Sequence, residues 1–161
     1  MGDIIRNYNK ADKESCVIAF KSNVPKYFTE EEITDFENFL DRLDKGTDDA
    51  NPGNTYFFVV VFNENVIGCG GFGDRYNDNI ISLAWGLIHK DFHKRGLGEK
   101  LLLHRLEQIK KIYPSSAVVI DTTQFSFSFF EKYGFVTTKI TRDYYTEGMH
   151  RYDMNLKKSS G

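Results

Sequence analysis

The sequence has few cysteines and no long apolar run. Cys16 and Cys69 are its only cysteines, and two thiols so far apart suggest neither a disulfide framework nor a metal site. No segment approaches the roughly 18 consecutive apolar residues of a membrane-spanning helix, and residues 1–7 lack the apolar core of a signal peptide. We therefore expect reduced thiols, no metal ion, no membrane partner and a cytoplasmic location.

An excess of basic residues is also missing. The chain has 21 Lys and Arg residues against 23 Asp and Glu, which gives a net charge of -2 at pH 7. Proteins that bind nucleic acids or anionic membranes usually carry a surplus of Lys and Arg. We therefore expect no nucleic-acid partner, and any site for an anion must be a local cluster of basic residues.

The length and composition are those of one globular domain. A chain of 161 residues has room for a single hydrophobic core. Its 40% hydrophobic and 27% charged residues exclude a disordered or a fibrous class. We expect residues 1–161 to form one domain.

Local patterns predict strands and helices in the order βααβββαβαββ. Thr29 and Glu32 form a capping box at the start of one helix, and a polar loop at 47–54 follows that helix. Residues 63–65 separate two β-rich runs as a hairpin turn does. Helix 98–112 has the clearest amphipathic pattern. The expected strands are 3–7, 56–62, 66–72, 80–89, 117–121, 135–143 and 149–156, and the expected helices are 11–20, 29–43, 98–112 and 126–133.

A basic loop containing two glycines joins strand 80–89 to helix 98–112. Its sequence is His89-Lys90-Asp91-Phe92-His93-Lys94-Arg95-Gly96-Leu97-Gly98-Glu99-Lys100. Gly96 and Gly98 permit left-handed backbone angles and leave room beside the amides. The helix start adds unpaired N–H groups and the positive end of its dipole, and Lys94 and Arg95 add two cations. These features favour a pyrophosphate site over the alternative, a solvated loop before a helix.

Two other phosphate-binding loops are alternatives for this segment. A Walker A loop requires Gly-Lys-Ser/Thr, whereas Gly98 is followed by Glu99-Lys100-Leu101, which excludes that loop. A dinucleotide-binding loop matches better, because Gly96-Leu97-Gly98 precedes a helix and Asp121 ends the next strand. However, Leu101 replaces its third glycine, and residues 89–95 separate the strand from Gly96. A nicotinamide-binding domain therefore stays a disfavoured alternative.

The loop resembles the acyl-CoA pyrophosphate loop of the GNAT superfamily of N-acetyltransferases. The family pattern Arg/Gln-x-x-Gly-x-Gly/Ala is matched by His93-Lys94-Arg95-Gly96-Leu97-Gly98, in which His93 departs from the usual Arg or Gln but is still a donor. Residues 121–135 resemble the second signature of the family, a strand and a short helix that closes with Lys132-Tyr133-Gly134-Phe135. The resemblance covers residues 80–135 and extends through the last hairpin to residue 156.

The resemblance implies an α/β (α+β) fold and an acetyl-CoA site. The implied fold has a mixed, mostly antiparallel central sheet of about six or seven strands flanked by about four helices. Strand 80–89 would be bulged and would splay from strand 117–121, so that the pantetheine arm inserts between them. The residues implied to bind acetyl-CoA are Leu87, Ile88, His89, His93, Lys94, Arg95, Gly96, Leu97, Gly98, Glu99, Lys100, Thr123, Ser126, Phe129, Phe130 and Lys132.

The resemblance also implies direct transfer of acetyl to an amine, with a backbone amide of the bulged strand stabilising charge on the thioester oxygen. Two family positions are changed here. Ser82 stands where many relatives have a glutamate base, and Phe130 stands where many have a tyrosine acid, so neither supplies the usual proton transfer. The remaining candidates for that role are Tyr133, Tyr144, Tyr145 and His150. Cys69 is expected to be a small packed residue and not a nucleophile.

We therefore predict an acetyl-CoA-dependent N-acetyltransferase, an acyltransferase of class EC 2.3.1. Its acceptor is expected to be a primary amine of a small molecule, an amino acid or a peptide. The alternative is a weakly active or non-catalytic acyl-CoA-binding module of the same fold, as Ser82 and Phe130 suggest. The sequence does not indicate which amine is acetylated, because variable elements bound that pocket in this fold. Residues 136–140, on an expected sheet edge, predict a homodimer contact.

Overall fold

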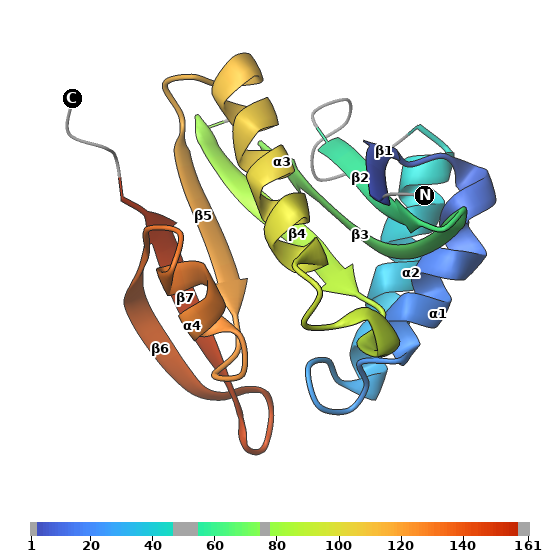
Figure 1. The fold of residues 1–161 in the computed structure, drawn as a ribbon. Helices are drawn as coiled ribbons and strands as arrows, with labels where there is room; N and C mark the ends of the chain where they lie inside the picture. The colour runs from blue at the N-terminus through green and yellow to red at the C-terminus, as the bar shows by residue number, and fades with distance from the viewer. Residues whose placement is uncertain (1–2, 47–54, 75–77, 158–161) are drawn as a thin grey trace.

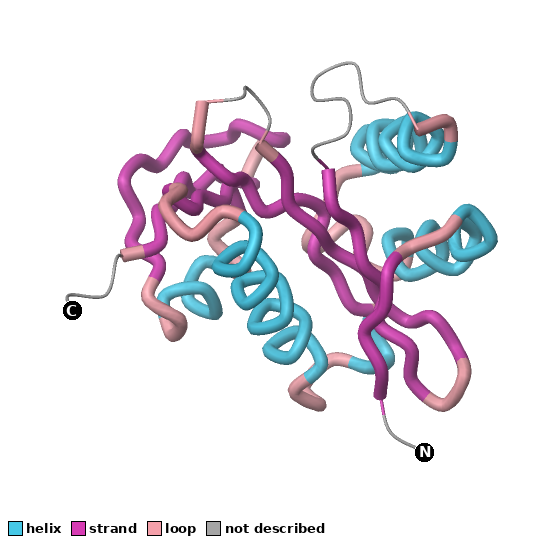
Figure 2. The backbone as a smooth tube through the Cα atoms, turned by 90° about the horizontal axis from the view of Figure 1, so that it is seen from above, coloured by secondary structure: helices cyan, strands magenta, loops and turns pink. Residues whose placement is uncertain are grey.

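A computed structural model describes residues 3–46, 55–74 and 78–157. The predicted loop at 47–54 and part of the loop before residue 80 lie outside these ranges. The described residues form a seven-stranded sheet in the order β1-β2-β3-β4-β5-β7-β6, and β4 and β5 are its one parallel pair. Helices α1 and α2 cover one face and α3 and α4 the other (Figure 2). The predicted mixed, mostly antiparallel α/β fold is confirmed.

The elements follow the predicted order. The strands are β1 (Asp3–Asn7), β2 (Thr55–Phe62), β3 (Asn65–Gly73), β4 (Ile80–Ile88), β5 (Ala117–Thr122), β6 (Phe135–Thr146) and β7 (Met149–Leu156). The helices are α1 (Lys13–Lys21), α2 (Glu30–Asp44), α3 (Leu97–Ile112) and α4 (Phe127–Glu131), with 3-10 turns at Lys10–Asp12 and Lys90–Phe92.

Three elements have a boundary that differs from the prediction by more than one residue, each for a local reason. Residues 10–12 form a 3-10 turn, so α1 begins at Lys13 and not at 11. Helix α4 has 5 residues. Beyond it the Gly134 amide donates a hydrogen bond to the Glu131 carbonyl, three residues back, so the chain forms turns there and the α-helix ends. Strand β6 continues to Thr146, since a register shift after Thr141 carries it past Asp143, whose φ is +53°.

The predicted helix start and hairpin are confirmed in detail. The Glu32 amide donates to Thr29 Oγ1 at 3.2 Å, and the Thr29 amide donates to Glu32 Oε1 at 2.9 Å, which is the reciprocal capping box. Between β2 and β3, Asn63 and Glu64 both have positive φ, 49° and 70°. Two such residues make the turn whose twist matches an antiparallel hairpin, and Phe62 pairs with Asn65.

The sheet divides the hydrophobic core in two. On the α1 and α2 face, Phe20 and Phe36 stack at 4.7 Å between ring centroids and pack with buried Cys69. On the α3 and α4 face, Leu102 and Phe72 belong to the other main cluster. Both cysteines are buried and free, as expected for packed thiols.

The surface of β6 bears on the homodimer prediction. Strand β6 is an edge strand of the sheet, and Val136, Ile140 and Tyr144 on it are exposed. An exposed edge with apolar side chains is a surface that can pair with another chain.

Among the helices of the described residues, none is long and apolar enough to span a membrane.

Candidate active site

Strands β4 and β5 separate after a short parallel contact. Their paired residues are Ile80 to Ser82 with Ala117 to Val119, and beyond them the strands diverge (Figure 1). A cavity of about 1000 Å³ lies in this opening, lined by residues of α2, α3, α4, β4, β5 and β6. The predicted splay is confirmed, and the site is built around it.

Strand β4 is bulged where it borders the cavity. Ala84 pairs with Gly71 and Leu87 pairs with Cys69, so Trp85 and Gly86 together stand opposite the single residue Gly70. Two residues against one leave backbone groups outside the regular ladder. Trp85 has a φ of +50°, and its ring packs against Phe20 and Phe36 on the α1 and α2 face. The predicted bulge is therefore present, and Trp85 anchors it.

The loop before α3 has the shape of an anion site. Gly96 is the N-cap of α3 with a φ of +78° and no side-chain cap, so the first amides of the helix, which have no helical acceptor, are uncovered. A Cβ on Gly96 would meet nothing within 4 Å, and one on Gly98 would meet only the Phe129 ring, at 3.9 Å. The loop therefore leaves space for a pyrophosphate beside the positive end of the helix dipole.

The cations at this end of the cavity are not the predicted pair. Lys94 lines the cavity, together with Lys132 from the segment after α4. Arg95 instead lies over the rings of Phe62 and Phe92, at 5.8 and 5.3 Å from their centroids, and does not line the cavity. Lys94 and Lys132, both among the residues predicted to bind acetyl-CoA, thus border the cavity.

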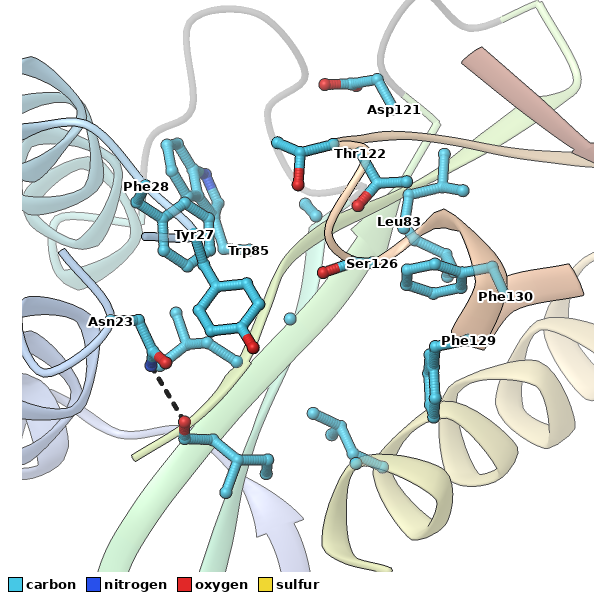
Figure 3. A pocket seen from close by; sticks show the side chains of 18 of the residues that line it. Asn23, Tyr27, Phe28, Leu83, Trp85, Asp121, Thr122, Ser126, Phe129 and Phe130 are labelled. Carbon is cyan, nitrogen blue, oxygen red and sulfur yellow. Dashed lines mark hydrogen bonds between the residues drawn. The ribbon is translucent and has the colours of Figure 1, made fainter. Parts of the chain in front are cut away.

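Two side chains hold the end of β4. Asn23 donates from Nδ2 to the Ile88 carbonyl at 2.9 Å, shown as the dashed line in Figure 3, and His93 Nε2 lies 2.8 Å from the same oxygen. A carbonyl only accepts hydrogen bonds, so this contact fixes the proton on Nε2. The Ile88 oxygen therefore has two partners, and His93 orients the loop.

Most of the residues predicted to bind acetyl-CoA border one cavity. Those that line it are Leu87, Ile88, His93, Lys94, Gly96, Gly98, Glu99, Thr123, Ser126, Phe129, Phe130 and Lys132. Those that do not are His89, Arg95, Leu97 and Lys100. Leu97 is buried in the core beside Ile67 and Ile88, and the His89 amide donates to the Ile67 carbonyl at 2.7 Å.

Ser82 and Phe130, the two changed family positions, both line the cavity. Phe130 is buried and makes an edge contact with Phe135. Ser82 lies where β4 still pairs with β5. Of two further predicted residues, Thr123 accepts the Phe125 amide at Oγ1, at 3.2 Å, and Ser126 precedes α4 with its side chain at the cavity (Figure 3).

The far wall of the cavity is lined by three carboxylates, by Arg42 and Arg151, and by aromatic rings. Glu32 and Asp35 come from α2 and Asp121 from the end of β5, and all three line the cavity. Burial raises the pKa of Glu32, with additional contributions from the negative charges of Asp35 and Asp121. Tyr27 and Trp85 lie across the opening from Thr122 and Ser126 (Figure 3). From the sequence, Glu32 was expected only to cap its helix, since no local pattern connects α2 to the end of β5.

The four candidates for proton transfer lie in different places. Tyr145 lines the cavity and donates to Asp121 Oδ2 at 2.7 Å, and burial and that carboxylate raise its pKa. Tyr133 lines the other end, where its hydrogen bond to the Glu99 carboxylate raises its pKa. Tyr144 lies at the rim under Arg151. His150 does not line the cavity, and its Nδ1 accepts the Asp143 amide at 3.0 Å.

A sheet splayed at a bulged strand, with a glycine loop leading into a helix beside the opening, is the arrangement that the resemblance to the GNAT superfamily implied. A family model described as an acetyltransferase (GNAT) domain matches residues 24–158. The chain belongs to this GNAT acetyltransferase family and is thereby an N-acetyltransferase of class EC 2.3.1 that uses acetyl-CoA. The family assignment removes the nicotinamide alternative. No curated protein sequence matches the chain significantly.

Solved structures confirm the fold. A GNAT-family protein from Desulfovibrio desulfuricans is 17% identical with a TM-score of 0.79, covering 97% of this chain and 99% of that one. Ard1 from Thermoplasma volcanium is 20% identical with a TM-score of 0.72, covering 98% and 100%. The PaiA N-acetyltransferase from Thermoplasma acidophilum, solved with coenzyme A, is 19% identical with a TM-score of 0.68, covering 98% and 100%.

Proposed function

We propose that this protein transfers acetyl from acetyl-CoA directly to a primary amine that enters from the α1 and α2 side. The observation that supports this is one cavity whose two ends differ: cations and a glycine loop lie at one end, and carboxylates, with Arg42 and Arg151 beside them, lie at the other. Lys94, Gly96 and Lys132 border one end, and Glu32 and Asp121 border the other. An anionic cofactor and a cationic amine can therefore meet at the β4 bulge between them.

A route through an acyl-enzyme is not needed in this arrangement. Cys69 is fully buried under the bulge, and burial raises its pKa well above that of a free thiol. A thiol is nucleophilic only as its thiolate. Direct attack by the amine is therefore favoured over transfer through Cys69.

The acidic wall fits a protonated amine acceptor. Glu32, Asp35 and Asp121 supply negative charge, and the rings of Tyr27 and Trp85 supply apolar and cation-binding surface. The proposed acceptor is a primary amine of a small molecule, an amino acid or a peptide. The coenzyme A bound to the Thermoplasma acidophilum PaiA protein supports the assignment of the other end to CoA.

Glu32 is the proposed general base. An amine of pKa about 10.4 is neutral in only about one molecule in 2500 at pH 7, which adds about 4.6 kcal/mol to the barrier. A carboxylate whose pKa is raised toward neutrality accepts the proton more readily than an ordinary one. Asp121, held by the Tyr145 hydroxyl, keeps lone pairs that can orient the ammonium group.

The bulge is the proposed site of charge stabilisation. The residues Trp85 and Gly86 stand outside the regular ladder, and amides there can donate to an oxygen that gains negative charge. Acetyl-CoA supplies the acyl group, and the chain's own groups position it, accept the amine proton and stabilise charge.

The alternative of a weakly active binding module rests on Phe130 and Ser82, which lack the usual catalytic groups. The test is a panel of primary amines incubated with acetyl-CoA, with release of the CoA thiol followed against an amine-free control. We expect at least one amine to support saturable turnover well above the control. Binding of acetyl-CoA without turnover for any amine would favour the binding module.

A further inference from the structure

Arg105 on α3 is a buried cation with no counter-ion among the residues that the structure describes. It is 3% exposed, and none of the ion pairs within the described ranges includes it. Its Nη1 donates to the Gly71 carbonyl at 3.3 Å, and its Nε has no hydrogen-bond partner. Burial lowers its pKa to about 10, so it stays charged at pH 7. A buried charge without an ion-pair partner lowers the stability of a fold, so its presence here suggests a functional role.

The backbone around the guanidinium is shaped to admit it. A Cβ on Gly86 would lie 2.7 Å from Arg105 Nη2 and 3.0 Å from Nη1, and a Cβ on Gly70 would lie 3.4 Å from Cζ. The two residues that face each other across the bulge are therefore glycines, and the guanidinium occupies the space that their side chains would need. Arg105 and Gly86 both line the cavity.

The bulge is thus held from both faces of the sheet. Trp85 packs into the aromatic cluster on the α1 and α2 face, and Arg105 lies against Gly86 from the α3 side. The titratable side chain that interacts electrostatically with Arg105 is Cys69, a buried thiol. This neighbour is neutral and does not balance the charge of Arg105, which lines the cavity.

We infer that Arg105 is a fixed positive charge that stabilises the negative charge collecting on the CoA sulfur as acetyl leaves it. This inference rests on the proposed function. Glu32 first takes a proton from the ammonium group and passes it to water. The nitrogen of the neutral amine then bonds to the acetyl carbon, the C–S bond breaks with its electron pair going to sulfur, and the proton that the nitrogen loses goes to Glu32. Arg105 donates no proton in this step, because a guanidinium stays charged. It acts on the α3 and α4 side, where Phe130 offers no hydroxyl.

The test is the ionisation of the CoA thiol bound to the protein. Ultraviolet absorbance of the thiolate is followed against pH for CoA bound to wild type, Arg105→Met and Arg105→Lys, with the free protein subtracted. Arg142→Met, an exposed arginine of β6 outside the cavity, is the matched control. We expect the bound thiol pKa to rise by about one unit or more in Arg105→Met and to stay low in Arg105→Lys and the control.

Turnover gives a second, independent readout. We expect Arg105→Met to lower kcat by about 10²-fold, as loss of one charge-stabilising group does, with the KM for acetyl-CoA changed far less. If Arg105→Met does not fold, the same measurement of the thiol pKa is made on Arg105→Gln, which keeps hydrogen-bond donors for the Gly71 carbonyl but carries no charge. A folded variant that binds CoA with the wild-type thiol pKa would overturn the inference. Failure of wild type to bind CoA would instead overturn the proposed function.

Discussion

The two ends of the cavity are built differently. At the cofactor end, the glycine loop, the start of α3 and the bulge of β4 present mainly backbone groups. At the acceptor end, side chains from α2, β5 and β6 meet, with Glu32, Asp121 and Tyr145 as the central groups. Backbone sites depend on glycines within one short segment, whereas side-chain sites depend on how distant segments pack. The first can be recognised in a sequence, and the second needs the fold.

The largest effect is expected at the acceptor end. Glu32→Gln should lower kcat by about 10²- to 10⁴-fold, because the amide cannot accept the amine proton, while acetyl-CoA binding is retained. Glutamine serves in a capping box as glutamate does, so the helix start should persist. Because the pKa of Glu32 is raised, wild-type turnover should fall at a higher pH on acidification than for an ordinary carboxylate. Initial-rate pH profiles should show this limb in wild type and not in the variant.

The control for Glu32→Gln is Thr29→Val, which removes the cap hydroxyl and keeps the carboxylate. It should cost about 1 kcal/mol of unfolding free energy with turnover largely intact. Equal loss of turnover in both variants would show that the helix start, and not the carboxylate, is what matters.

The second-largest effect is expected from a change at the cofactor end of the cavity. Gly96→Asp adds a side chain at a φ of +78° and a negative charge at the helix start beside the pyrophosphate site. We expect acetyl-CoA affinity to fall by about 10- to 100-fold, measured by calorimetry. Gly46→Asp is the matched control, because Gly46 also has positive φ, +71°, with open space around it and lies outside the cavity. Unchanged affinity in Gly96→Asp would remove the loop from the site.

A smaller effect is expected for Tyr145→Phe. The change removes the hydroxyl that donates to Asp121 at 2.7 Å and leaves that carboxylate less fixed. We expect the KM for the amine to rise by about tenfold, equivalent to about 1.4 kcal/mol, with acetyl-CoA affinity unchanged. Steady-state kinetics at saturating acetyl-CoA measure this, and a loss confined to kcat would assign Tyr145 to proton transfer instead.

The smallest effect is expected for His150→Gln. The side chain of His150 accepts the Asp143 amide within the last hairpin and does not border the cavity. We expect kcat/KM to stay within about twofold of wild type, as for most surface changes away from a site. A large loss of kcat would return His150 to the list of proton-transfer groups.

Local patterns in the sequence predicted the order of elements and the capping box, and the resemblance to the GNAT superfamily implied the bulge and the splay. Gly96 and Gly98, which the glycine pattern of the loop marked in the sequence, both line the cavity. The sequence did not predict that the Arg95 side chain lies over the rings of Phe62 and Phe92. These two rings come from separate segments that meet only in the folded chain. The sequence also assigned no functional role to Arg105 or Glu32, because only the packed sheet brings α2 and α3 to the same cavity.

The central claim is that the opening between β4 and β5 binds acetyl-CoA through the loop before α3. Calorimetric titration of the wild-type protein with acetyl-CoA, with NADH as the control ligand, tests it most directly. We expect saturable binding of acetyl-CoA with a Kd on the order of micromolar, a binding free energy near −8 kcal/mol, and no heat from NADH. No binding of acetyl-CoA, or equal binding of NADH, would contradict it.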